Sequence, residues 1–116
     1  MLKSAADLIS EAQKTIHCVD ISTARTLYES AESPVIIDVR EADAASKSKL
    51  TNSINISRGL LEMKIEKQCP NPDALILLHC GGGGRASLAA QTLQQMGYTN
   101  VHAITARFDD ILAEFG

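Results

Sequence analysis

The chain has 116 residues, of which 45% are hydrophobic and 22% charged, and its net charge is −3. This length suits a single domain with an apolar core. The acidic balance, with two Tyr, two Phe and no Trp, argues against a surface for nucleic acid or anionic membrane. No apolar run reaches the ~20 residues of a membrane span, and the N-terminus lacks the apolar stretch of a signal peptide.

The cysteine pattern indicates reduced thiols. Cys18, Cys69 and Cys80 are odd in number and irregular in spacing, which does not suit a disulfide framework. No Cys-x-x-Cys pair is present, so a structural zinc site is not expected. We therefore expect a cytoplasmic protein that holds no metal.

Helix and strand patterns alternate along the whole chain. The first half predicts a helix over 4–15 capped by Ser4, a strand over 17–21, a helix that starts at Ser22 or Thr23, a strand over 35–39, a weak helix over 41–49, a strand over 53–56 and a helix over 58–67. The second half predicts a strand over 74–78, a helix over 85–96 closed by Gly97, a strand over 100–104 and a helix over 108–115. Such alternation predicts an α/β fold with a parallel sheet and helices on both faces.

Ligands of open parallel sheets bind beyond the C-terminal ends of the strands, and two strand ends carry polar residues here. One reads Asp38-Val39-Arg40-Glu41. The other reads His79-Cys80, then Gly81, Gly82, Gly83 and Gly84, then Arg85 at a helix start. Glycines allow the backbone N–H groups to converge as an anion-binding nest, and the helix N-terminus adds partial positive charge. A cysteine thiol there ionises readily, so Cys80 is predicted to be a nucleophile rather than a core residue.

Three other motifs compete for this loop. The spacing Gly81-x-Gly83-x-x-Ala86 formally fits a dinucleotide fingerprint, but only one strand follows and it does not end on an acidic residue. A Walker loop requires a lysine that this loop lacks. A cysteine phosphatase places five residues between cysteine and arginine, whereas four stand here. The shorter ring of amides suits a single sulfur atom better than tetrahedral phosphate.

These residues resemble a single-domain rhodanese, a sulfurtransferase. The resemblance rests on Asp38-Val39-Arg40-Glu41, on residues 80–85 as a six-residue active loop, on Arg85-Ala86-Ser87 and on the run 97–101. It implies a five-stranded parallel sheet, a persulfide on Cys80, a rhodanese-like domain over 16–116 and an added N-terminal helical extension over 1–15. Family loops often carry side chains that select the substrate, and this glycine-only loop has none before Arg85.

The remaining polar residues near the two strand ends are assigned simpler roles. Asp38 is expected to bond to backbone or to Arg40, and Arg40 to pair with an acid rather than line the pocket. Strand alternation turns His79 away from Cys80, which favours packing over general-base catalysis. Arg107, near the end of the last strand, is a candidate for the mouth of the site. Cys18 and Cys69 are expected to be inert, with a resolving role for Cys69 as the alternative.

The sequence therefore predicts a sulfurtransferase that needs no metal or organic cofactor. Cys80 would take sulfur from thiosulfate or a persulfide, small or protein-borne, while the amides of Gly81–Arg85 stabilise the charge. Cyanide or a thiol would then accept the sulfur. The alternatives are a phosphatase or arsenate-type enzyme on the same loop, and a non-catalytic rhodanese-like module that binds a partner or senses oxidation.

Overall fold

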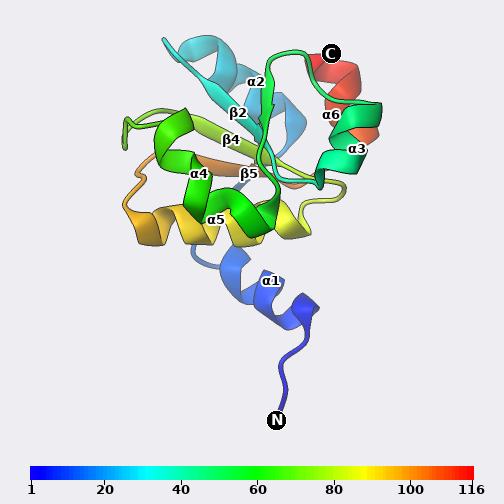
Figure 1. Ribbon diagram of the computed structural model, residues 1–116, viewed down its shortest axis with the longest axis vertical. Coiled ribbons are helices and arrows are strands. Elements are labelled where there is room, and N and C mark those ends of the chain that lie inside the picture. The colour runs from blue at the N-terminus through cyan, green and yellow to red at the C-terminus, as the bar shows by residue number, and fades with distance from the viewer.

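The computed structural model describes all 116 residues, and its centre is a parallel sheet of five strands (Figure 1). The strands are short and run in the spatial order β1-β5-β4-β2-β3. Their bounds are β1 His17–Val19, β2 Val35–Asp38, β3 Ser53–Asn55, β4 Ile76–His79 and β5 Val101–Ile104. The expected fold class, with five parallel strands and an additional N-terminal helix, is confirmed.

Helices lie on both faces of the sheet, as Figure 1 shows. The helices are α1 Ala5–Gln13, α2 Ile21–Ser30, α3 Ala42–Lys47, the 3-10 turn η1 Arg58–Leu60, α4 Leu61–Gln68, α5 Gly84–Met96 and α6 Phe108–Phe115. α4 and α5 cover one face and α2 and α6 the other, while α1 packs on the outer side of α5. No helix is long and apolar enough to span a bilayer.

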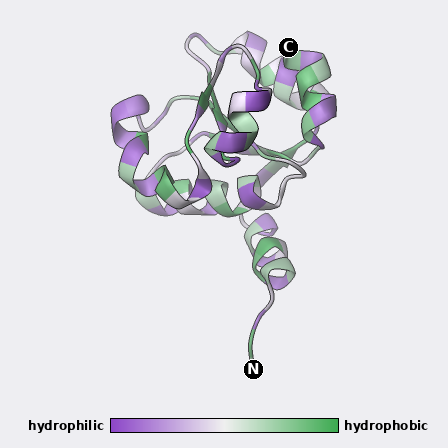
Figure 2. Cartoon of the chain, turned by 45° about the vertical axis from the view of Figure 1, so that its right-hand side comes forward, coloured by the Kyte–Doolittle hydropathy of each residue, from purple (hydrophilic) through white to green (hydrophobic).

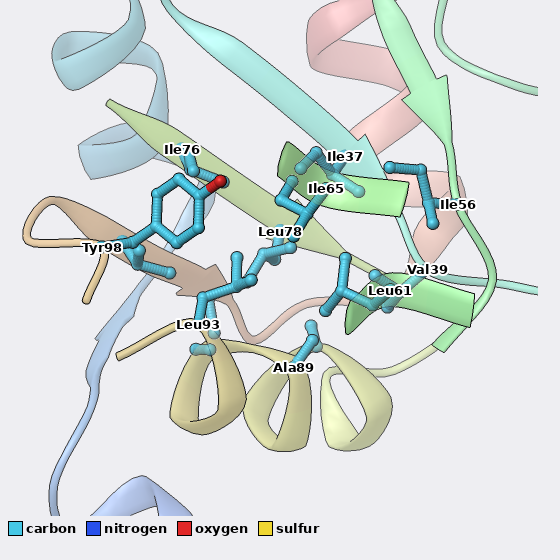
Figure 3. Packing of buried hydrophobic residues seen from close by; sticks show 14 of the residues in the cluster. Ile37, Val39, Ile56, Leu61, Ile65, Ile76, Leu78, Ala89, Leu93 and Tyr98 are labelled. Carbon is cyan, nitrogen blue, oxygen red and sulfur yellow. The ribbon is translucent and has the colours of Figure 1, made fainter. Parts of the chain in front are cut away.

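The core consists of one aliphatic layer on each side of the sheet. Strand alternation sends Ile76, Leu78 and Cys80 to the α4/α5 side, where they meet Leu61, Ile65, Ala89 and Leu93 (Figure 3). On the other side Leu75 and Leu77 pack with Ala24, Ile36, Leu50, Ile104 and Ile111. β4 lies in the middle of the sheet and all of its residues are buried, so Cys80 follows the central strand of the core.

Several element boundaries differ from the sequence predictions. α2 starts at Ile21 because the Asp20 carboxylate, rather than Ser22 or Thr23, caps it by accepting from the Thr23 N–H at 2.8 Å. β4 is shifted toward the C-terminus because its ladder pairs Val35 with Ile76 and Asp38 with His79. The helix expected from residue 58 begins as the 3-10 turn η1, and α5 begins one residue early, at Gly84.

Helix α1 follows its predicted design but buries little of itself. Ser4 caps the helix, as the sequence predicted, and it does so in a reciprocal capping box with Asp7. Ala12 is fully buried and Ile9 half-buried, whereas Leu8 stays 47% exposed. Figure 2 shows the helix projecting from the body of the protein with apolar residues along part of its surface. Its contact with α5 therefore rests on a narrow seam.

Candidate active site

The Cys80 sulfur lies inside a ring of backbone amides. Its Sγ accepts the N–H of Gly83 at 3.1 Å and the N–H of Ala86 at 3.4 Å. The residue directly follows β4 and is only 1% exposed. Two N–H donors aimed at one sulfur suit a thiolate, because charge-assisted hydrogen bonds are the stronger kind. The structure thus brings Cys80 and the glycine loop together as the sequence predicted.

The glycines at positions 82, 83 and 84 differ in how closely the rest of the protein approaches them. Gly83 adopts φ +105°, and a Cβ there would lie 3.0 Å from the Thr105 Cα. A Cβ at Gly84 would lie 2.9 Å from the Ile9 Cδ1 on α1. A Cβ at Gly82 would meet nothing within 4 Å. Gly83 therefore requires glycine for its conformation and its close approach to backbone, Gly84 lies against the movable end of the Ile9 side chain, and Gly82 lies in open space.

Other loop amides remain available to a ligand. The N–H groups of Gly82, Gly84 and Arg85 donate to no acceptor in the protein. Gly84 and Arg85 open α5, so their N–H groups point out of its N-terminus together with that of Ala86. The partial positive charge of a helix N-terminus acts at the same place. This arrangement stabilises negative charge on or just beyond the Cys80 sulfur.

Arg85 supplies the only side-chain charge in the loop. It is exposed and forms no ion pair or side-chain hydrogen bond. A Cβ built on Gly81 would lie 3.4 Å from the Arg85 Nη2, so the guanidinium folds back over the start of the loop. Its charge is therefore free to meet an anionic substrate. Arg107 is exposed and directly precedes Phe108, whose N–H donates to the Gly81 carbonyl of the loop at 3.1 Å.

Asp38 and Arg40 form the expected pair at the end of β2. The Arg40 Nε donates to Asp38 Oδ1 at 3.0 Å and its Nη2 to Oδ2 at 2.8 Å, while the Arg40 backbone N–H also donates to Oδ1. Burial alone would raise the pKa of Asp38, but the hydrogen bonds and charge of Arg40 hold it below its ordinary value. Arg40 also donates to the Ser48 carbonyl at 2.6 Å. Both side chains are buried, so they support the site without lining it.

Phe108 connects this pair to the loop, a role that sequence analysis did not assign. The Arg40 guanidinium lies 3.7 Å above its ring, and the His79 ring is stacked against it with 5.8 Å between centroids. The Phe108 N–H donates to the Gly81 carbonyl at 3.1 Å. The first turn of α6 therefore holds the outer end of the loop in place.

His79 is packed on the side of the sheet opposite Cys80, as alternation predicted. It is fully buried, and neither ring nitrogen has a hydrogen-bond partner. Burial lowers the pKa of His79 to about 4, which the charge of Asp38 only partly opposes. A neutral ring that faces away from the sulfur cannot take its proton directly.

The other two cysteines lie away from the loop. The Cys69 carbonyl accepts the Tyr98 hydroxyl at 2.6 Å, beyond the C-terminal end of α5. Cys80 lies at the N-terminal end of that 13-residue helix, roughly 18 Å away along its axis. A direct resolving role for Cys69 therefore does not fit the geometry. Cys18 is exposed on the edge strand β1, and burial raises the pKa of both thiols.

The mouth of the loop is open rather than hollowed. The smaller of the two surface hollows, of about 330 Å³, lies near Ser33, Asp73 and Asn100, before the strands begin. The other lies along α4. Neither hollow is lined by Cys80 or the glycine loop, so the loop opens onto a shallow part of the surface.

Comparison with known proteins agrees with this architecture. YrkF, a putative sulfur carrier protein of Bacillus subtilis, is 26% identical over 100 residues, 86% of this chain and 53% of that protein, so the chain spans about half the length of this relative. A Rhodopseudomonas palustris structure of unknown function, described as a possible tyrosine phosphatase, is 30% identical, with a TM-score of 0.80 over 96% of this chain and 90% of that chain. The Wolinella succinogenes polysulfide-sulfur transferase homodimer is 25% identical, with a TM-score of 0.74 over 92% and 80% of the two chains. Residues 23–114 match the Rhodanese-like domain family, and the chain belongs to that family.

Proposed function

We propose that the protein is a sulfurtransferase that carries a sulfane sulfur as a persulfide on Cys80. The observation that carries the proposal is the Cys80 Sγ inside its amide ring, with N–H donors at 3.1 and 3.4 Å and Arg85 at the helix start. The family match, the sulfur carrier relative and the polysulfide-sulfur transferase structure support it.

The reaction proceeds in two balanced steps on one atom. The Cys80 thiolate attacks the outer sulfur of the donor, forms a new S–S bond and breaks the donor's own bond to that sulfur. The donor leaves with the electron pair, as sulfite from thiosulfate or as a thiolate from a persulfide. An acceptor nucleophile, cyanide or a thiolate, then attacks the outer sulfur of the Cys80 persulfide and returns the thiolate. This is ping-pong covalent catalysis.

The protein stabilises each charged species without moving. The amides of Gly83 and Ala86 hold the inner sulfur, and those of Gly82, Gly84 and Arg85 are free for the outer one. Such fixed dipoles act where charge develops, as an oxyanion hole does for oxygen. No step in this sequence needs a metal or an organic cofactor.

A persulfide is the preferred donor in this proposal, whether small or borne by a cytoplasmic partner protein. Thiosulfate is a dianion, and the loop offers it a single side-chain cation, Arg85. Weak electrostatic capture predicts a high apparent KM for thiosulfate, at least about millimolar. The shallow mouth admits a larger donor because no cavity wall limits its size.

A phosphatase is the second candidate, because the Rhodopseudomonas palustris relative is described as a possible one. The loop length opposes it, since four residues rather than five separate Cys80 from Arg85 and the ring of amides is correspondingly smaller. A non-catalytic binding module would not require two amides directed at the thiol, and a redox-sensing cysteine is normally accessible to solvent, whereas Cys80 is only 1% exposed. We therefore expect negligible hydrolysis of aryl phosphates, and efficient turnover would favour the phosphatase.

Intact-mass analysis after incubation with donors tests the proposal. The native protein should gain one sulfur atom and lose it again with cyanide, releasing thiocyanate. Cys80→Ser should gain none while its unfolding midpoint stays unchanged. Cys18→Ser and Cys69→Ser are the matched controls and should keep most of the uptake. A persulfide mapped to another cysteine, or uptake by Cys80→Ser, contradicts the assignment.

A further inference from the structure

A chain of hydrogen bonds connects helix α1 to the active loop. The Ser87 hydroxyl donates to the Gly83 carbonyl at 2.7 Å, and the Ser87 N–H donates to the same oxygen at 2.9 Å. Gln13 Nε2 donates to Ser87 Oγ at 3.1 Å. A hydroxyl has one proton, which Ser87 gives to Gly83, so Gln13 must be the donor in the first contact. The relay therefore has one direction, from Gln13 through Ser87 to Gly83.

Helix α1 meets the same peptide a second time. Ile9 precedes Gln13 by four residues and so lies on the same face of α1. Its Cδ1 would lie 2.9 Å from a Cβ at Gly84. The peptide that joins Gly83 to Gly84 is thus contacted on both sides. The relay holds its carbonyl group, and the Ile9 side chain lies beside the Gly84 Cα. Glycine at position 84 is what lets α1 approach this closely.

The other end of this peptide lies at the N-terminus of α5, the end of the helix from which Ala86 donates to the Cys80 sulfur. A trans peptide points its N–H opposite to its C=O, so the Gly84 N–H leaves the N-terminal end of α5. The Ala86 N–H leaves the same end and reaches the Cys80 sulfur. Linked hydrogen bonds polarise one another, so donors to the Gly83 carbonyl strengthen the Gly84 N–H as a donor. They also restrain Gly83, whose own N–H holds the sulfur.

We propose that α1 is a working part of the sulfur site, in which Gln13 is a positioning residue that acts through Ser87 on the Gly83–Gly84 peptide. The inference rests on the proposed function in one respect, because the charge to be stabilised is that of the Cys80 persulfide. It assigns to the N-terminal extension a role in reactivity, beyond that of an appended helix.

The test compares two identical substitutions. Gln13→Met keeps the length of the side chain and removes the amide donor. Gln95→Met makes the same change on the exposed C-terminal turn of α5 and is the control. We expect Gln13→Met to lower the rate of persulfide loading about fivefold, equivalent to one net hydrogen bond. The control should load at the native rate, and both variants should keep the native melting temperature within a few degrees.

Alkylation of Cys80 by iodoacetamide, followed by peptide mass from pH 5 to 9, gives a readout that needs no sulfur donor. The pH profile of Gln13→Met should move to higher pH relative to Gln95→Met, a shift that loss of stability alone would not produce. Coincident profiles overturn the proposal. If the native protein takes up no sulfur, the proposed function fails while the alkylation profiles still decide on the relay.

A double-mutant cycle with Ser87→Ala tests whether the effect passes through the hydroxyl. Once that hydroxyl is gone, Gln13→Met should have no further effect on the alkylation profile. Full additivity of the two substitutions means that Gln13 acts by another route and overturns the relay.

Discussion

Replacing Gly83 with alanine should damage both stability and sulfur chemistry. The left-handed φ of +105° costs an L-residue roughly 1–2 kcal/mol, and the new Cβ would lie 3.0 Å from the Thr105 Cα. Backbone atoms cannot move aside as the end of a side chain can, so we expect a total of about 2–3 kcal/mol. In a domain of this size that lowers the melting temperature by roughly 8–15 °C.

The same substitution should weaken the hydrogen bond from the Gly83 N–H to the Cys80 Sγ, because relief of the strain rotates that peptide. Losing one preorganised donor of this kind lowers a rate by about a hundredfold. Gly82→Ala is the matched control, since its Cβ meets nothing within 4 Å and its φ is not positive. Its free energy of unfolding should lie within about 0.5 kcal/mol of that of the native protein. Thermal and urea unfolding, followed by persulfide loading, measure both effects. Equal unfolding midpoints for the two variants would refute the reasoning.

Three further outcomes follow from the same geometry. Burial holds the pKa of His79 at about 4 rather than 6.5, so the unfolded chain binds a proton at a higher pH than the folded protein does. The free energy of unfolding should therefore fall by up to about 3 kcal/mol between pH 6.5 and pH 4. In urea titrations, His79→Leu should flatten this dependence on pH. Because the Ile9 side chain can move aside, Gly84→Ala should lower the free energy of unfolding by no more than about 1 kcal/mol and should raise it in the Ile9→Ala background; additivity of the two substitutions would disprove the contact. Gly82→Lys should raise kcat/KM for thiosulfate severalfold, most at low salt, whereas Gly82→Glu should lower it; equal kinetics would show that a charge at this position does not steer the donor.

Local patterns in the chain were sufficient for the fold class and for the centre of the site. Apolar runs of strand length alternate with helical spacing, and a buried strand leads straight into four glycines and an arginine. Each of these patterns spans only a few residues, so it can be recognised without knowing how the helices and strands pack together. The pairing of Asp38 with Arg40 was predictable for the same reason, because only one residue separates them.

Strand order and the supports of the loop were decided by tertiary structure alone. Gln13 and Ser87 lie 74 residues apart and share no motif, so nothing local identifies their hydrogen bond. The stacking of Phe108 on Arg40 likewise joins the ends of two different strands. A glycine run signals freedom of the backbone, but only the close approach of Thr105 and Ile9 distinguishes Gly83 and Gly84 from Gly82, which has no neighbour within 4 Å. Such contacts depend on how distant elements pack, which hydrophobic periodicity does not encode.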